Sequence, residues 1–199
     1  ELLAAGAKYK EVLAQEPNNV DALNLLGVIM HTANDLELAV ELISRATELA
    51  PDYVPALINL GNALQAVGRP EDAVKKFERA LELDPGAGIA ASNLASALND
   101  LALHEESRRA GERAVQLSSE LPDAYVNLGN ALLGLGRSEA AEAKYTAALE
   151  LDPHHPGAWF NLGNAHADAD NFRAAVSSYT KAVQFDPGNG DAHYNLANA

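Results

Sequence analysis

The sequence repeats itself every 34 residues, and this period restricts the fold more than any other feature. The pentapeptide Asn-Leu-Gly-Asn-Ala stands at residues 59–63 and returns unchanged at 127–131 and 161–165. Two related pentapeptides occupy residues 93–97 and 195–199, so the leading asparagines follow one another at a constant spacing of 34. A fixed period of this length indicates a repeat array, in which each unit packs mainly on its neighbours.

The period divides the chain into five complete units with a partial unit at each end. Residues 1–19 are expected to form one helix and a turn, with Ala5, Tyr9 and Val12 on one face of the helix. Residues 190–199 begin a further unit and stop partway. We treat residues 1–199 as a single array, whose complete units are 20–53, 54–87, 88–121, 122–155 and 156–189.

Each unit contains two helical patterns joined by a short turn. In the second unit the first pattern runs from about Pro55 to Val67, and residues 68–71 then start another helix with a proline and an acid in its first turn. Residues 84–86, Asp-Pro-Gly, end that helix because proline cannot continue it and glycine tolerates positive φ. No segment alternates at period two, so the predicted fold class is all-α.

The units resemble the tetratricopeptide repeat. The fifth complete unit carries the pattern at Trp159, Leu162, Gly163, Ala175, Tyr179, Ala182 and Pro187. The second unit carries it at Leu57, Leu60, Gly61, Leu64, Ala73, Phe77, Ala80 and Pro85. The resemblance covers the whole chain and implies a right-handed superhelical α-solenoid of antiparallel helix pairs, whose first helices line an inner groove. Trp159, Tyr179 and Phe77 are then expected in the core.

The third complete unit, 88–121, departs from this pattern. Ala91 stands where the other units carry a large side chain, Gly111 replaces an aromatic residue or isoleucine, and Ser119 replaces the terminal proline. Loss of a buried aromatic side chain typically costs roughly 3–5 kcal/mol. We therefore expect this unit to be the softest part of the array and the place of a bend.

Composition argues against two classes of partner. The 14 Lys and Arg residues against 28 Asp and Glu give a formal net charge of −14. Such a chain is repelled by nucleic acid and by anionic membrane surfaces, and no apolar run approaches the roughly 18 residues of a membrane span. There is no cysteine and no signal segment. We expect a soluble, cytoplasmic protein that binds neither nucleic acid nor membrane.

Motifs for catalysis or for a cofactor are missing. The sequence has no phosphate-binding glycine loop, no nucleophile elbow and no zinc-binding helix motif. His166 and Asp168 lie two residues apart and would point to different sides of a helix, so no metal site is expected. His154 and His155 are interpreted as solvated turn residues. We expect this chain to have no enzymatic activity, no cofactor and no metal.

Asparagines recur in pairs, one helical turn apart, on the first helix of most units. Asparagine is a weak helix former, costing up to about 0.7 kcal/mol relative to alanine, so its recurrence calls for a reason. Each side-chain amide offers donors and acceptors, which suit the main chain of an extended peptide. Alternatively, the amides tie neighbouring helices together or hold water. The candidate peptide-binding asparagines are Asn59, Asn62, Asn93, Asn127, Asn130, Asn161, Asn164 and Asn195.

Residues beside the asparagines extend the candidate site. Ile58, Val126 and Phe160 precede the first asparagine of their units and are expected to face or border the groove, where they would select apolar side chains. Asp123 lies at the groove-side start of its helix. All 14 basic residues fall outside the predicted first helices. The expected partner is therefore a protein or extended peptide that is neutral or basic rather than acidic.

In the tetratricopeptide repeat family that the chain resembles, domains that bind a C-terminal carboxylate carry Lys and Arg on these inner helices. The predicted first helices of this chain carry neither residue. Its asparagines are similar to those of the repeat arm of O-linked N-acetylglucosamine transferases, which holds protein substrates by their backbone. The leading hypothesis is a non-catalytic scaffold that binds an extended peptide. One alternative is the substrate-recruiting arm of a larger O-linked glycosyltransferase. The other is a structural solenoid that associates with itself end to end through uncapped ends.

Overall fold

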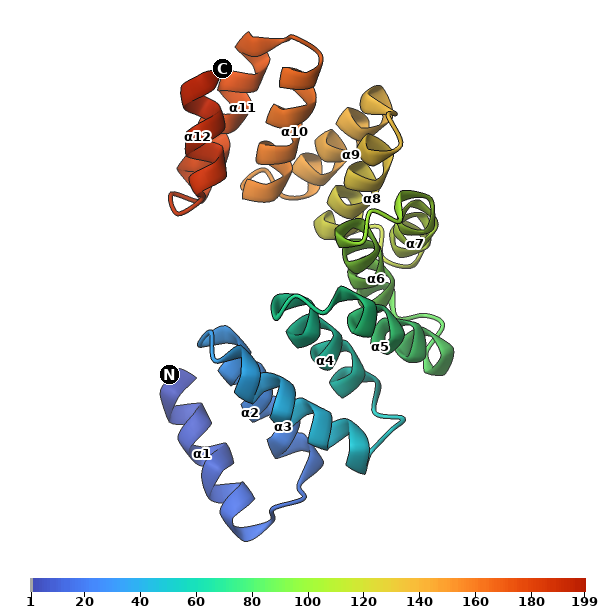
Figure 1. Ribbon diagram of the computed structural model, residues 1–199, viewed down its shortest axis with the longest axis vertical. Coiled ribbons are helices and arrows are strands. Elements are labelled where there is room, and N and C mark those ends of the chain that lie inside the picture. The colour runs from blue at the N-terminus through green and yellow to red at the C-terminus, as the bar shows by residue number, and fades with distance from the viewer. Residues whose placement is uncertain (1) are drawn as a thin grey trace. The chain divides into compact units, whose positions relative to one another are not determined.

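The structure, a computed structural model, describes residues 2–199, with side chains from residue 5 onward. This part of the chain forms twelve α-helices and no strand (Figure 1). The predicted all-α class is therefore confirmed. The first helix predicted in the second unit begins and ends within one residue of the observed helix, Val54–Ala66.

The helices fall into two alternating sets. The first helices begin at the first residue of each unit, and they are α2 (Val20–Thr32), α4 (Val54–Ala66), α6 (Gly88–Asp100), α8 (Pro122–Gly134), α10 (Pro156–Asp168) and α12 (Gly190–Asn198). The second helices precede or follow them, and they are α1 (Leu2–Gln15), α3 (Leu36–Leu49), α5 (Pro70–Leu83), α7 (His104–Leu117), α9 (Ser138–Leu151) and α11 (Phe172–Phe185).

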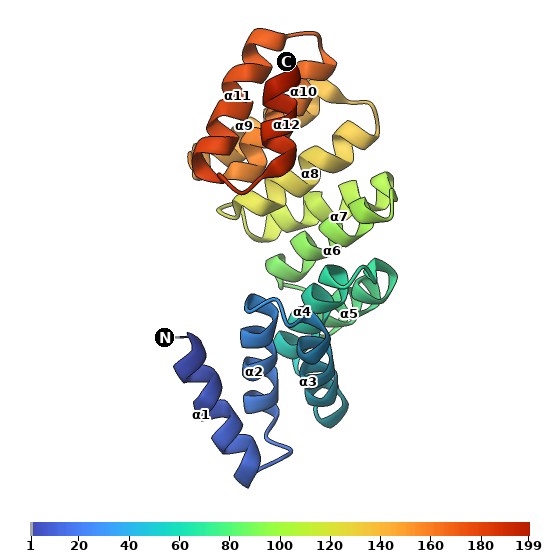
Figure 2. The same ribbon diagram turned by 60° about the vertical axis from the view of Figure 1, so that its left-hand side comes forward.

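The chain forms two compact units, an N-terminal unit of residues 1–97 and a C-terminal unit of residues 98–199, and the boundary between them in the sequence falls within α6. In the N-terminal unit α2 packs on α3 and α4 on α5, while α3 also packs on α4. The C-terminal unit repeats this arrangement with α8, α9, α10 and α11, as a second view shows (Figure 2). Each unit is thus a solenoid of consecutive helix pairs, and the single array over 1–199 stays a prediction.

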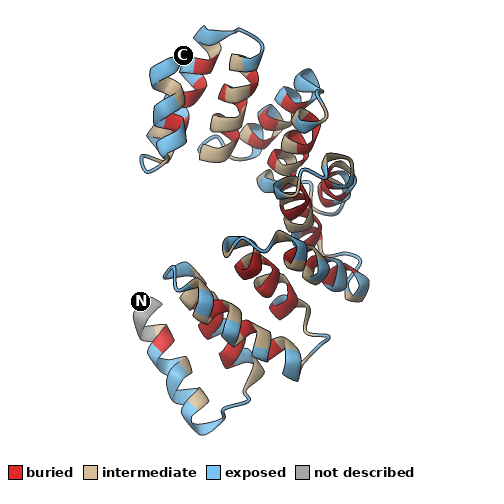
Figure 3. Cartoon of the chain, viewed as in Figure 1, coloured by how far each residue is buried: buried red, intermediate tan, exposed pale blue. Residues whose placement is uncertain are grey.

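Close approach within a pair depends on a glycine of the first helix facing a ring of the second helix. A Cβ atom at Gly61 would lie 2.4 Å from Cε1 of Phe77, and one at Gly129 would lie 2.5 Å from Cε1 of Tyr145. Such distances leave no space for any side chain. Both rings are 0% exposed, and buried residues line the facing sides of the helices (Figure 3).

The predicted core aromatic residues are buried to different extents. Phe77 is 0% exposed and Tyr179 is 2% exposed, so both predictions are confirmed. Trp159 is only partly buried, and its indole N–H donates to the carbonyl oxygen of Pro153 at 2.9 Å. It packs against the core of the C-terminal unit from the edge.

Helix α1 presents a different face from the predicted one. Ala5 and Tyr9 are partly buried, but Val12 is 38% exposed. Gly6 is buried instead, and Leu13 packs against the core of the N-terminal unit. The prediction for Val12 was wrong because the packed face of α1 includes the neighbouring position.

The third repeat fills its core with small residues. Gly111 of α7 stands where other second helices carry a ring, and a Cβ there would lie 3.1 Å from Cα of Leu128 in α8. The backbone of α7 therefore approaches α8 closely. The buried residues of this helix are Ser107, Ala110, Gly111 and Ala114. Such residues remove less apolar surface from water than the equivalent face of α9, which includes Tyr145.

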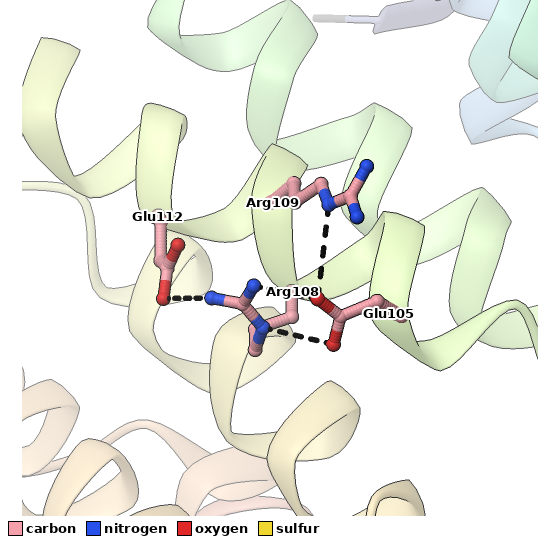
Figure 4. A network of polar contacts seen from close by, with 4 residues as sticks. All are labelled: Glu105, Arg108, Arg109 and Glu112. Carbon is pink, nitrogen blue, oxygen red and sulfur yellow. Dashed lines mark hydrogen bonds and ion pairs between the residues drawn. The ribbon is translucent and has the colours of Figure 1, made fainter.

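The exposed side of α7 carries an ion-pair network. Arg108 pairs with Glu105 at 2.7 Å and with Glu112 one turn further on, while Arg109 lies 3.7 Å from Glu105 (Figure 4). Solvent screens exposed pairs of this kind within one helix, so each contributes little to stability. The network supports α7 locally and does not replace the missing contact of an aromatic ring.

The turn inside each helix pair contains one residue with a left-handed backbone. Its φ is 75° at Gly68, 72° at Gly136 and 55° at Ala102. Asn34 and Asp170 hold the same place in their units, with φ of 62° and 56°. Alanine has neither the conformational freedom of glycine nor the local hydrogen bonding of Asn and Asp, so Ala102 is strained.

We predict that Ala102→Gly raises the free energy of unfolding by about 1 kcal/mol, because relief of the left-handed strain exceeds the entropy cost of glycine. Ala169→Gly is the matched control, since Ala169 is exposed at the end of a first helix but has φ −90°. That control should lower stability. Urea unfolding of the full chain measures both effects, and equal changes in the two variants would contradict the strain at Ala102.

A second prediction concerns residues 88–121. We expect their backbone amides to exchange with solvent faster than those of the repeats at 54–87 and 122–155, because the small buried residues of α7 stabilise the repeat less. Hydrogen exchange followed by mass spectrometry measures this difference. Finding residues 88–121 to be the best protected repeat would overturn it.

Candidate functional site

The asparagines of successive first helices hydrogen-bond to one another. In the C-terminal unit, Nδ2 of Asn161 donates to Oδ1 of Asn130 at 2.9 Å, and Nδ2 of Asn195 donates to Oδ1 of Asn164 at 3.0 Å. Each bond joins the leading asparagine of one repeat to the second asparagine of the repeat before it. We use the name amide ladder for the set Asn59, Asn62, Asn93, Asn127, Asn130, Asn161, Asn164 and Asn195.

The N-terminal unit contains the same kind of bond. Nδ2 of Asn93 donates to Oδ1 of Asn62 at 2.8 Å. Nδ2 of Asn59 donates at 2.9 Å to Oδ1 of Asn24, which is 2% exposed. Sequence analysis missed Asn24 because it stands at the position of Ile58, one residue before the repeated asparagines.

Asn127 takes part through its backbone. Its carbonyl oxygen accepts from Nδ2 of Asn99 at 3.0 Å. Asn99 lies two residues beyond the third repeat's pentapeptide, so the pattern of asparagines gave no signal for it. The contact places an additional amide beside the amide ladder in the C-terminal unit.

Two tyrosine hydroxyls reach the amide ladder from the second helices. The hydroxyl of Tyr145 donates to Oδ1 of Asn130 at 2.9 Å, and that of Tyr179 donates to Oδ1 of Asn164 at 2.9 Å. Burial raises the pKa of both tyrosines, and a hydrogen bond with Asn195 opposes the rise in the pKa of Tyr179. Both groups are therefore neutral hydrogen-bond donors at physiological pH.

These bonds use one side of each amide and leave the other side open. The Oδ1 atoms of Asn130 and Asn164 each accept two hydrogen bonds, whereas their Nδ2 atoms have no partner in the described part of the chain. Among the described residues, the buried side-chain polar atoms without a partner are Asn99 Oδ1 and His104 Nδ1. The free Nδ2 atoms of the amide ladder therefore reach solvent.

A hollow of about 560 Å³ lies beside this part of the ladder in the C-terminal unit. Asn164 and Asn195 line it together with Phe172 and Tyr194, which are 50% and 70% exposed. Asp168 adds a carboxylate. The wall thus combines amides, exposed aromatic surface and negative charge.

Much of the side-chain surface of the three apolar candidates, Ile58, Val126 and Phe160, is covered by neighbouring residues. Val126 is 7% exposed and packs with Ala148 and Ala158, so it leaves little surface for a ligand. Ile58 is partly buried against the core of the N-terminal unit. Phe160 is partly buried, with its ring 6.1 Å from the ring of Tyr179. The three residues share one sequence position but differ in exposure.

Asp123 forms a link between repeats. Its Oδ1 lies 3.1 Å from Nε2 of His155, while Nδ1 of His155 accepts from the backbone N–H of Ala158 at 3.1 Å and caps α10. The His155 side chain is only 17% exposed. The interpretation of His155 as a solvated turn residue was wrong. Asn19 and Asn189 cap helices at the equivalent position, and this recurrence is the signal that could have revealed the role.

The contact between Asp123 and His155 changes the pKa of both side chains. The hydrogen bond to His155 lowers the pKa of Asp123, and the carboxylate in turn raises the pKa of His155. Burial opposes part of the rise in the pKa of His155, because desolvation disfavours the protonated ring. One carboxylate oxygen of Asp123 is thus engaged, and its side chain remains 66% exposed.

The charges of the first helices are all of one sign. None of the 14 Lys and Arg residues lies within the bounds of these helices. Their carboxylates are Asp21, Asp100, Asp123, Asp168 and Asp191. The first helices of both units therefore carry carboxylates and no Lys or Arg.

Two further properties of the described residues bear on function. No group of three or more His, Asp or Glu side chains among them could hold a metal ion. None of their helices is both long enough and apolar enough to cross a membrane.

Helix pairs repeated at a constant period, each packed on the next, define the class of α-solenoid repeat proteins. Tetratricopeptide repeat profiles match residues 1–64, 58–122, 126–190 and 163–199. The chain therefore belongs to the tetratricopeptide repeat family, whose members generally mediate protein–protein interactions. No curated protein matches the sequence.

Solved structures share the fold. YrrB, described as a tetratricopeptide repeat protein with an unusual peptide-binding site, is 23% identical, with a TM-score of 0.63 over 94% of this chain and 96% of its own. A thermophilic tetratricopeptide repeat protein of Thermus thermophilus, TTC0263, is 19% identical, with a TM-score of 0.80 over 90% of this chain and 97% of its own. The Cut9–Hcn1 hetero-tetramer of APC/C is 16% identical, with a TM-score of 0.90 over all of this chain and 39% of the matched chain. Identities this low show the fold alone.

We predict that Asp123→Asn lowers the pKa of His155, because the carboxylate is the main cause that raises it. Asp152→Asn is the matched control and should lower the pKa less, since Asp152 makes a smaller contribution. A raised folded pKa means that the contact stabilises the fold fully below the ordinary value of 6.5 and loses this effect as pH rises through the folded pKa. NMR titration of the His155 ring measures the shift, and equal effects of the two variants would contradict the assignment.

Proposed function

We propose that the chain is a non-catalytic protein-interaction scaffold that binds an extended segment of a partner protein along the amide ladder. The observation that carries this proposal is the set of amide atoms that packing leaves open. Nδ2 of Asn130 and of Asn164 reaches solvent and has no partner among the described residues, although Oδ1 of each amide accepts two hydrogen bonds. Such donors match the main-chain carbonyl oxygens of an extended peptide.

Main-chain recognition would make the affinity largely independent of the partner's sequence. The leading asparagines add acceptors, because the Oδ1 atoms of Asn161 and Asn195 make no hydrogen bond within the described part of the chain. A peptide backbone carries one donor and one acceptor at nearly every residue. Rows of both groups on successive first helices can therefore bind it at several points.

Charge and hydrophobic surface would supply the selectivity. The first helices carry carboxylates and no basic residue, so neutral or basic segments are favoured over acidic ones. The hollow beside Asn164 and Asn195 offers exposed Phe172 and Tyr194 to apolar side chains. Val126 is buried and would contribute little to this selectivity. Ile58 and Phe160 are partly buried and would contribute only their exposed edges.

The fold of YrrB, whose description includes a peptide-binding site, is compatible with this proposal. Two other hypotheses stay predictions. One is that the chain is the substrate-recruiting arm of a larger O-linked glycosyltransferase, and the other is end-to-end self-association. No contact in the described residues favours either of them.

We predict that Asn130→Asp weakens peptide binding about tenfold while the fold is retained. An aspartate keeps an oxygen that accepts from Asn161 and Tyr145, but it replaces the open donor with an acceptor that repels carbonyl oxygens. Affinity is measured by fluorescence polarisation with labelled twelve-residue peptides of basic, neutral and acidic composition. Neutral and basic peptides should bind more tightly than acidic ones.

Gln116→Glu is the matched control for this prediction. It introduces the same charge on the exposed side of α7 and should leave affinity unchanged. Thermal unfolding checks that both variants are folded. Equal affinity of the folded Asn130→Asp variant and the wild type would remove the amide ladder from the mechanism.

A further inference from the structure

Tyr145 and Tyr179 have a role in the site that no sequence pattern assigns. Both are buried ring residues of the second helices, at 0% and 2% exposure. Each hydroxyl donates to the Oδ1 atom of an asparagine on the first helix of the same pair, at 2.9 Å. Neither hydroxyl has another acceptor among the described residues. Their only acceptor is thus the amide ladder.

Amide orientation follows from this contact. An asparagine amide can turn by half a rotation about its terminal bond, which exchanges its oxygen and nitrogen in nearly the same space. If Asn130 turned, Nδ2 would face Tyr145, and the buried hydroxyl proton would have no acceptor. Leaving one buried donor unpaired disfavours that orientation by about 5- to 150-fold. Tyr145 therefore holds Oδ1 of Asn130 inward and Nδ2 outward.

The N-terminal unit contains a natural comparison. Phe77, also 0% exposed, occupies the position of Tyr145 and has no hydroxyl. Among the described residues, Oδ1 of Asn62 accepts only from Nδ2 of Asn93, at 2.8 Å. If both amides turn together, Nδ2 of Asn62 donates to Oδ1 of Asn93, and one hydrogen bond is kept. This pair can thus present either a donor or an acceptor to solvent.

We propose that Tyr145 and Tyr179 are positioning residues that fix the amides of Asn130 and Asn164 as outward donors. In the C-terminal unit these donors would bind carbonyl oxygens of the partner segment, whereas the Asn62–Asn93 pair adapts to a donor or an acceptor. The statement about the partner depends on the proposed function. The statement about orientation stands on the contacts alone.

The orientation is tested without a ligand. In the wild type, the side-chain Nδ2 protons of Asn130 lie on the far side of the amide from Tyr145, so the nuclear Overhauser effect to its ring protons is weak. In Tyr145→Phe the turned form becomes populated and this effect grows several-fold. Phe77→Tyr is the reciprocal variant and should weaken the effect between the residue 77 ring and the Asn62 Nδ2 protons. Unchanged effects in both folded variants would overturn the proposal.

Folding is checked separately. Phenylalanine already fills this position at residue 77, so Tyr145→Phe should retain the helix packing, and thermal unfolding measures any loss. A purely structural role for the hydroxyl would change stability without changing the orientation of Asn130. The nuclear Overhauser effect therefore distinguishes a positioning role from a structural one.

The proposed donation from Asn130 and Asn164 to carbonyl oxygens of a peptide, which is the ligand part of the proposal, is tested with the neutral peptide that binds most tightly in the polarisation assay. Its backbone carbonyls are replaced one at a time by thioamides, which are weaker hydrogen-bond acceptors. In the wild type at least one replacement should lower affinity about tenfold, and this loss should shrink in the Tyr145→Phe, Tyr179→Phe double variant. The same loss in both proteins would overturn the donor role. If no peptide binds the wild type, the proposed function and the ligand part both fail, while the ligand-free experiment still decides the orientation.

Discussion

The close contact between a glycine of the first helix and a ring of the following second helix, present in the second, fourth and fifth complete repeats, is the constraint on which the packing of these helix pairs depends. Gly61 with Phe77 and Gly129 with Tyr145 bring two helix axes so near that no side chain fits between them. This approach fixes the rotation of both helices, because any turn of either would drive the ring into the backbone. Once the rotation is set within a pair, the second asparagine of the first helix lies near the ring, as Asn130 does to Tyr145 and Asn164 to Tyr179. The amide ladder is thus a consequence of packing inside each pair.

The period and the turn residues made the fold predictable, whereas the partners of individual side chains were not. The 34-residue spacing placed the helices because proline, glycine and acidic residues recur at their ends. The same spacing could not show that Asn161 reaches Asn130, since that bond joins residues 31 apart on different helices. Nor could it separate Val126 from Phe160, which share a position. Val126 is covered by Ala148 and Ala158, and only the folded neighbours determine this.

The third repeat, residues 88–121, forms a helix pair without the contact between a glycine and an aromatic ring. With Gly111 at the ring position, the backbone of α7 lies close to Leu128 of the next helix. Space that a ring would fill is thereby closed, but the buried surface consists of Ser107, Ala110 and Ala114. A repeat array suits such a change because its stability is close to a sum of units and of contacts between neighbours. A less stable repeat therefore lowers its own contribution to the stability of the array and leaves the geometry of the other repeats unchanged.

In the proposed function, the amide ladder would serve packing and ligand binding with different atoms of the same residue. Oδ1 of Asn130 accepts from Tyr145 and Asn161, whereas Nδ2 of Asn130 remains open to solvent. Removing the whole side chain would abolish both roles together, so a loss of binding after such a change would not show which role was lost. Exchanging only the nitrogen for an oxygen separates them, because the inward bonds persist. The proposed function would explain the recurrence of asparagine at these positions, because this short side chain carries an inward acceptor and an outward donor on two separate atoms, which aspartate, alanine and serine do not.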